Sequence, residues 1–121
     1  MDNNYKIPGK TRIGHVHLKV SNIQRSLDFY CGILGYELTL MYGEDAAFIS
    51  AGGYHHHIGL NVWYSKNGAP PSRNTTGLFH TAILYPTRKD LADIFYRLRQ
   101  LNYPITKNHA VSAILGKRGL V

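Results

Sequence analysis

Histidine is the residue type in this chain best able to do chemistry, because seven of its 121 residues are histidine. In the segment IGHVHLKV, residues 13–20, apolar and polar residues alternate strictly. Alternation with a period of two is typical of a β-strand with one face on a core. His15 and His17 therefore share the face that points away from that core.

A second alternating segment, HHIGLNVWY at residues 56–64, carries another histidine on its polar face. There His57, Gly59 and Asn61 lie opposite the aliphatic side chains, which we expect to pack against a helix. The histidine faces of the two segments would then line one common surface. We expect His17 and Asn61 on this surface to face a substrate.

Three imidazoles on rigid strands could hold a metal ion, and His80, in a third apolar segment, is the candidate that joins His15 and His57. Neutral imidazole nitrogens suit divalent iron, zinc, manganese, nickel and cobalt. The alternative is that each histidine is a partly buried strand residue with a satisfied hydrogen bond. We expect His56 to face away from His57, either packed or solvated.

The segments that would position these histidines follow one order, strand–helix–strand–strand–strand. After residues 13–20, Ser21 or Asn22 offers an N-cap, and apolar residues recur at helical spacing until Gly35, a favourable residue just past a helix end. Residues 36–42, 46–51 and 56–64 then predict three strands separated by glycine turns.

The same order restarts after a Pro-, Gly- and Asn-rich loop, which indicates an internal repeat. Residues 78–85 predict a strand, Thr87 and Asp90 a capped helix start, and Asn102 occupies the place of Gly35. His80 then aligns with His15. We divide this single domain into module one (about 12–65), a linker (66–76) and a partial module two (77–121).

Length and composition bound the class of protein. A chain of 121 residues with 44% hydrophobic and 17% charged residues is typical of one globular domain. The single Cys31 excludes an internal disulfide, and no apolar run is long enough to span a bilayer, so we expect a cytoplasmic protein without a membrane partner. The net charge of +7 is scattered and carries no nucleic-acid-binding motif, so we expect no nucleic-acid partner.

Three segments together resemble the vicinal oxygen chelate superfamily, which contains glyoxalases, bleomycin-resistance proteins and extradiol dioxygenases. These segments are GHVHLKVSNIQRSLDFYCGILGYEL, AAFISAGGYHHHIGLN and GLFHTAILYP. The likeness is greatest to single-domain glyoxalase-like and catechol 2,3-dioxygenase-like domains. It implies an α+β fold in which two βαβββ modules form a half-barrel cup, a small-molecule substrate and a homodimer.

The resemblance also implies roles for particular residues. His15 and His80 match the first-strand metal ligands of the two modules, and His57 matches either a fourth-strand ligand or a catalytic acid/base residue. The ion would be divalent, with Fe(II) or Mn(II) favoured over Zn(II) or Ni(II). It would bind two neighbouring oxygens of the substrate and stabilise an enolate or catecholate.

The chain departs from the family pattern near its C-terminus. The family's last ligand is a glutamate in a segment resembling D-P-D-G-N-x-I-E-L, and the sequence after Ser112 reads AILGKRGLV instead. Module two therefore reads as truncated, without the carboxylate of a two-histidine, one-carboxylate triad. Two alternatives to a metalloenzyme follow: a drug-binding protein of the same fold that needs no metal, and an inactive truncated homologue.

Overall fold

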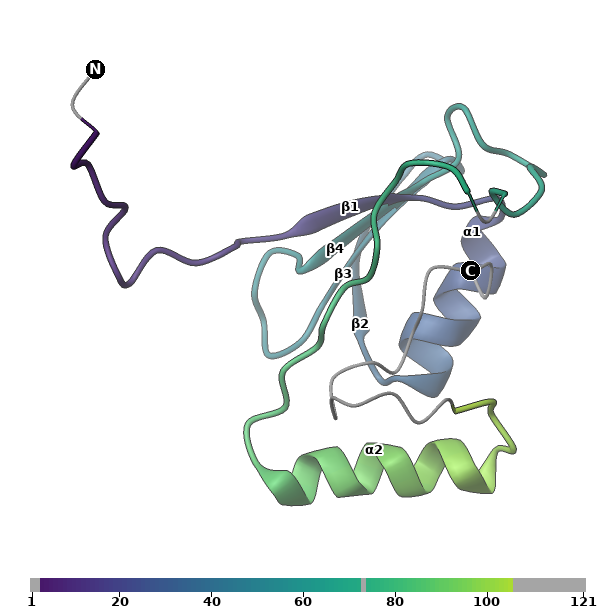
Figure 1. Cartoon of the computed structure of the whole chain (residues 1–121). Helices are drawn as coiled ribbons and strands as arrows, with labels where there is room; N and C mark the ends of the chain where they lie inside the picture. The colour runs from purple at the N-terminus through teal and green to yellow at the C-terminus, as the bar shows by residue number, and fades with distance from the viewer. Residues whose placement is uncertain (1–2, 73, 106–121) are drawn as a thin grey trace.

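The computed structural model describes residues 3–72 and 74–105, and its centre is a mixed four-stranded sheet (Figure 1). The strands are β1 (Val16–Lys19), β2 (Glu37–Tyr42), β3 (Ala46–Ser50) and β4 (Ile58–Asn61). Their order across the sheet is β1-β4-β3-β2. β1 runs parallel to β4, whereas β4 with β3 and β3 with β2 are antiparallel.

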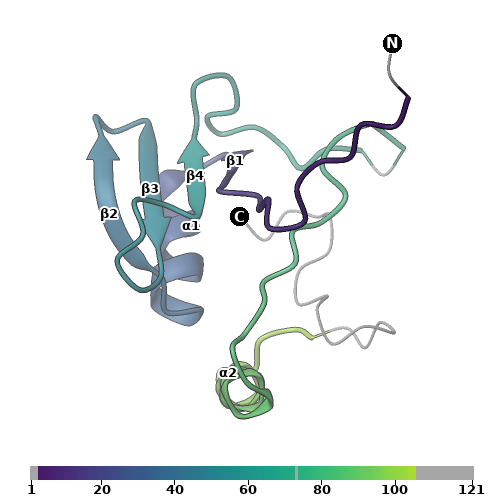
Figure 2. The same cartoon turned by 90° about the vertical axis from the view of Figure 1, so that its left-hand side faces the viewer.

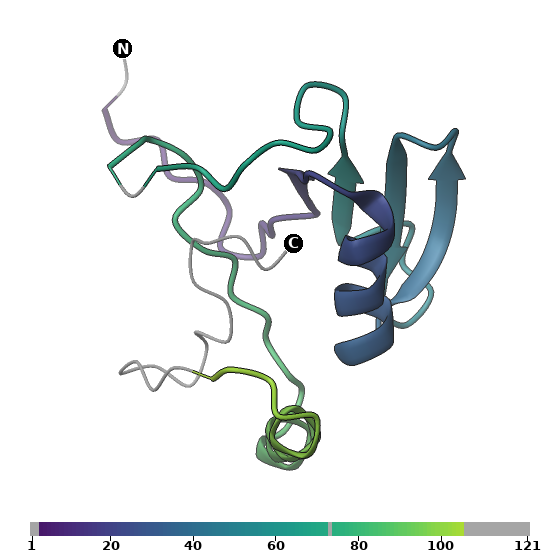
Figure 3. The ribbon, with the colours of Figure 1, turned by 90° about the vertical axis from the view of Figure 1, so that its right-hand side faces the viewer.

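One helical segment covers one face of this sheet. It begins as α1 (Ile23–Leu27) and continues as the π-helix η1 (Asp28–Ile33). The segment lies behind the sheet in Figure 2 and in front of it in Figure 3, and no helix of the described chain covers the opposite face. The core lies between sheet and helix, and its buried hydrophobic residues are Val20, Ile23, Phe29, Tyr30, Ala47, Ile49, Ile58, Leu60 and Val62.

The expected order of module one is confirmed, with shorter strands than the alternation predicts. Asn22 is the N-cap of α1, where its side-chain oxygen accepts a hydrogen bond from the backbone N–H of Arg25 at 2.8 Å. Gly35 ends the helical segment with φ +86°, a conformation that glycine adopts at little steric cost. These two residues therefore determine where the helical segment that covers the sheet begins and ends.

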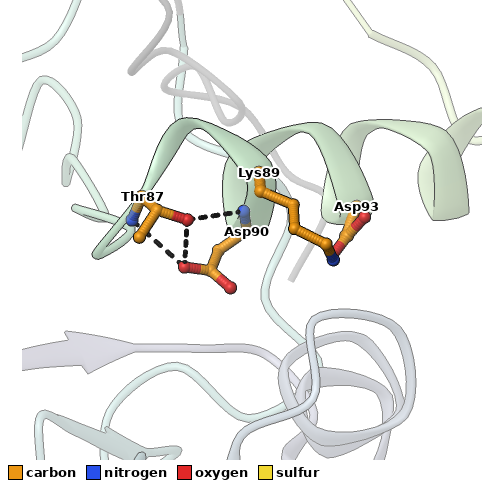
Figure 4. A network of polar contacts seen from close by, with 4 residues as sticks. All are labelled: Thr87, Lys89, Asp90 and Asp93. Atoms are coloured by element: carbon orange, nitrogen blue, oxygen red, sulfur yellow. Dashed lines mark hydrogen bonds and ion pairs between the residues drawn. The ribbon is translucent and has the colours of Figure 1, made fainter.

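The second helix is also confirmed. α2 (Arg88–Gln100) begins with a capping box in which the Thr87 hydroxyl accepts from the Asp90 N–H and the Asp90 carboxylate accepts from the Thr87 N–H (Figure 4). Lys89 forms an ion pair with Asp93 one turn later, at 2.6 Å. Asn102 follows the helix with φ 51°, the left-handed conformation that Gly35 adopts after the first helix.

The strand predicted over residues 78–85 is wrong. This segment precedes α2 but forms no strand, and most of its side chains are exposed. A strand requires a neighbour that completes its ladder of backbone hydrogen bonds. Within residues 3–72 and 74–105, the sheet ends at β1 and β2, and no strand pairs with residues 78–85.

α2 is attached to the first half of the chain through its own side chains. The Arg97 guanidinium donates hydrogen bonds to the carbonyl oxygens of Gly32 and Ile33, at 2.8 and 2.9 Å. These carbonyls lie at the end of η1, where backbone acceptors lack partners within the helix. No helix in the described part of the chain is long and apolar enough to cross a membrane.

Candidate functional site

The face of the sheet that carries no described helix holds the candidate site. Strand register places His17 of β1 opposite Gly59 of β4, and Gly59 opposite Phe48 of β3. Leu40 of β2 continues this row beyond Phe48. Two ring systems therefore lie on either side of a glycine at the centre of the face.

His17 lies on this face, as the alternation of residues 13–20 predicts. Its ring lies 5.8 Å from that of Trp63 and 6.0 Å from that of Phe48, measured between centroids. The side chain remains exposed. An exposed imidazole between two aromatic side chains offers a surface for a planar ligand together with a hydrogen-bonding nitrogen.

Asn61, the other residue expected to face a substrate, is buried, with 4% of its surface exposed. Its side-chain oxygen accepts a hydrogen bond from the Trp63 backbone N–H at 3.3 Å. Asn61 is the last residue of β4, and this hydrogen bond holds the backbone that follows the strand and carries Trp63. Its contact with a substrate stays a prediction.

His15 forms a cluster with two histidines of the loop between β3 and β4. Its ring centroid lies 4.4 Å from that of His56 and 6.2 Å from that of His55. The Nδ1 atoms of His55 and His56 are 2.8 Å apart, so one donates a hydrogen bond to the other. The ring of His56 also lies 4.9 Å from that of Phe48, which joins this histidine cluster to the row on the sheet.

His57 makes different contacts from those the sequence suggests. Its Nδ1 accepts a hydrogen bond from the Ala51 N–H at 3.2 Å and lies 3.3 Å from the Ser50 hydroxyl. Its ring lies against that of Tyr54, with centroids 4.7 Å apart. These contacts hold the loop between β3 and β4 in shape, so His56 rather than His57 approaches His15.

His80 lies in the extended segment before α2, where its side chain is exposed and its ring lies 5.1 Å from that of Phe79. Among the residues that the structure describes, no three His, Cys, Asp or Glu side chains form a group that could hold a metal ion. The expected roles of His15, His57 and His80 as ligands stay predictions. The region of the expected carboxylate, beyond residue 105, lies outside the described residues.

The histidine cluster alters the acid–base behaviour of His56. Burial lowers the pKa of His56 below its ordinary value of 6.5, and repulsion by the neighbouring imidazoles, His15 first among them, lowers this pKa further. The lowered pKa favours the neutral form of the His56 imidazole at pH 7. A neutral imidazole can accept a hydrogen bond or bind a cation without first losing a proton.

The lowered pKa predicts that the chain loses stability in mild acid. The unfolded chain takes up a proton on His56 at higher pH than the folded chain does, so the free energy of unfolding falls as the pH decreases from about 6.5 through the lowered folded pKa. Urea unfolding at pH 7.5 and pH 5 measures this loss. His56→Gln should lose less stability between these pH values than the unsubstituted chain, and equal losses would contradict the assignment.

Sequence reasoning missed the contribution of His55, His56 and Phe48. The alternation rule applies within β4, which begins only at Ile58, and residues 55–57 lie in the loop before it. The Thr39 hydroxyl, on a different strand, lies 2.9 Å from the His55 carbonyl oxygen and thereby ties this loop to β2. The apolar strand pattern of residues 46–51 includes Phe48, but this pattern does not show that Phe48 lies beside Gly59.

This chain is similar to proteins of known sequence and known structure. The family model described as Glyoxalase/Bleomycin resistance protein/Dioxygenase superfamily matches residues 12–109. A catechol-2,3-dioxygenase of Bacillus subtilis (strain 168) is 40% identical over 100 residues, which are 82% of this chain and 35% of that protein. The chain thus spans about a third of the length of this curated relative.

Solved structures of the same fold share less sequence. A lactoylglutathione lyase from Agrobacterium tumefaciens matches with a TM-score of 0.62 at 17% identity, covering 84% of this chain and 78% of that one. A virulence protein from Salmonella typhimurium matches with a TM-score of 0.57 at 22% identity, covering 81% of this chain and 74% of that one. At these identities the likeness concerns the fold alone.

Proposed function

The chain belongs to the Glyoxalase/Bleomycin resistance protein/Dioxygenase superfamily, and on this premise we propose that it binds two neighbouring oxygens of a small substrate, as a metal-dependent glyoxalase-like or extradiol-dioxygenase-like enzyme. The observation that carries the proposal is the gathering of His15, His17 and His56 with Phe48 at the uncovered face of the sheet. The 40% identity to a catechol-2,3-dioxygenase favours a planar diol as the substrate.

The donor atoms near this face suit a divalent metal only in part. His15 and His56 offer imidazole nitrogens, which bind Fe(II), Mn(II), Zn(II) and Ni(II). The described residues do not complete a group of three ligands. We propose that His80 and a residue from the His55–His57 run join His15 in the bound state. The ion would supply Lewis-acid stabilisation of a negatively charged substrate oxygen.

The side chains of this face would bind and orient the substrate. The rings of His17, Phe48 and Trp63 offer contacts to a planar ligand, because aromatic rings attract one another in offset or edge-on arrangements. Whichever of His56 and His57 does not bind the ion can accept a proton from a substrate hydroxyl within its reach, and the lowered pKa of His56 favours the neutral imidazole that this requires. We also propose that two copies of the chain form a homodimer.

Thermal unfolding with added metal tests the proposal. A ligand that binds only the folded state stabilises it by about 2.7 kcal/mol when its concentration is 100 times its Kd. We expect Mn(II) or Fe(II), added without oxygen, to raise the Tm of the full chain, and catechol to raise it further. If no divalent metal moves the Tm and the purified chain carries none in stoichiometric amount, the metalloenzyme proposal fails.

A metal-free binding protein is the second candidate, and a specific observation favours it. Within residues 3–72 and 74–105 the ligand set is incomplete, whereas the aromatic side chains around His17 are all in place. Such a face could hold a flat organic molecule without any reaction. This candidate predicts that catechol binds equally well with and without metal, and the metalloenzyme predicts tighter binding with metal.

A further inference from the structure

Gly59 lies at the centre of the uncovered face, and nothing in its backbone requires glycine. It sits within β4, between β1 and β3, and its φ is not positive. A glycine inside a strand destabilises the fold relative to alanine, because glycine loses more backbone freedom on folding. Glycine inside a strand often marks a place where another group approaches the backbone closely.

The group that approaches Gly59 is the imidazole of His17. A Cβ atom placed on Gly59 would lie 2.7 Å from His17 Nδ1, 2.9 Å from Cε1 and 3.2 Å from Cγ. Contacts this short between a carbon and the atoms of a ring are repulsive, since the optimum separation of non-bonded carbons is about 3.5–4.0 Å. The ring of His17 therefore occupies the space that any other residue at position 59 would fill.

This position of the ring determines its other contacts. Because it leans from β1 over β4, the imidazole reaches both Phe48 on β3 and Trp63 beyond the end of β4. A methyl group at position 59 would push the ring away from the sheet, toward the side on which the His17 side chain is exposed. The backbone of β4 could then stay in place.

We propose that Gly59 is a positioning residue that lets the His17 imidazole lie over the sheet, where it forms the platform against which the planar part of a substrate stacks. The platform rests on the proposed function, because it requires that a small planar molecule binds this face. The positioning role of Gly59 does not rest on it, because the His17 ring already lies over the sheet when no substrate is bound.

The first experiment measures the ring position by NMR in the full chain. The unsubstituted chain should show nuclear Overhauser effects from the His17 ring protons to Phe48 and Trp63. In Gly59→Ala these should disappear, while the backbone effects between β1 and β4 persist. Gly32→Ala is the matched control, since a Cβ there meets nothing within 4 Å. If the His17 ring in Gly59→Ala still lies against Phe48 and Trp63, the positioning role is overturned.

The second experiment measures binding of catechol, with the non-planar cyclohexane-1,2-diol for comparison. Stacking against aromatic side chains is modest, so we expect Gly59→Ala to weaken catechol binding about fivefold and to leave cyclohexane-1,2-diol unchanged. In a His17→Ala background, Gly59→Ala should have no further effect. If Gly59→Ala moves the His17 ring away from the sheet and catechol still binds with unchanged affinity, the platform is overturned.

The two experiments separate the two proposals. If catechol does not bind the unsubstituted chain, the proposed function and the platform both fail, and the NMR measurement still decides the role of Gly59. If catechol binds and the His17 ring stays in place in Gly59→Ala, the proposed function stands and the inference about Gly59 fails.

Discussion

Replacing His15 with alanine is expected to weaken binding of Mn(II) or Ni(II) by about 100-fold or more, because even the loss of a residue that only supports a ligand costs about 10–100-fold. His15 is the residue common to every ligand set considered for this chain. It immediately precedes β1 and contacts His56 directly, with ring centroids 4.4 Å apart. Isothermal titration calorimetry at pH 7.5 measures the change.

Two further substitutions show which histidine accompanies His15. The ring of His56 faces His15, whereas Nδ1 of His57 is engaged by Ser50 and Ala51. We therefore expect His56→Ala to weaken metal binding more than His57→Ala does. The opposite order would show that the loop rearranges around the ion. If the His15→Ala chain bound the metal ion as tightly as the unsubstituted chain does, His15 would not be a ligand.

Leu60→Ala is the substitution expected to destabilise the fold most. Leu60 is fully buried in β4, between Leu18 of β1 and Ala47 of β3 in the register of the sheet. Replacing a buried leucine with alanine typically costs about 2–5 kcal/mol, because less apolar surface is buried and a cavity remains. Small domains are stable by only about 5–15 kcal/mol, so much of the free energy of unfolding would be lost.

Leu84 provides the matched control for this experiment. The same substitution there removes a side chain that is 89% exposed, in the segment before α2. Exposed substitutions usually change stability by less than about 0.5 kcal/mol. Urea unfolding should therefore separate Leu60→Ala clearly from Leu84→Ala. Similar losses in both variants would mean that residues 78–85 contribute to the core as much as β4 does.

Sequence patterns predicted those parts of the fold that depend on neighbouring residues. Alternation predicted that His17 lies on one face of its strand and that Val16 and Leu18 lie on the other face, and the structure confirms this. Local hydrogen bonding determines the capping box at Thr87 and the helix ends at Gly35 and Asn102, so these too were predictable.

The remaining features depend on contacts between segments far apart in the chain. Residues 78–85 have the pattern of a strand, but a strand forms only where a partner strand lies beside it. The direction of His56 depends on a loop held by Thr39 and Ser50, which no periodicity of residues 56–64 encodes. The close approach of His17 to Gly59 likewise requires the parallel pairing of β1 with β4.

The most direct test of the proposed metal site is NMR of the full chain, with histidine side chains labelled, during titration with Mn(II). A bound paramagnetic ion broadens the signals of nearby nuclei before those of distant ones. The proposal predicts that the ring signals of His15, His56 and His80 broaden first, at less than one equivalent of Mn(II), and that His15→Ala abolishes this selectivity. Uniform broadening of all histidine signals, or none at one equivalent, would contradict it.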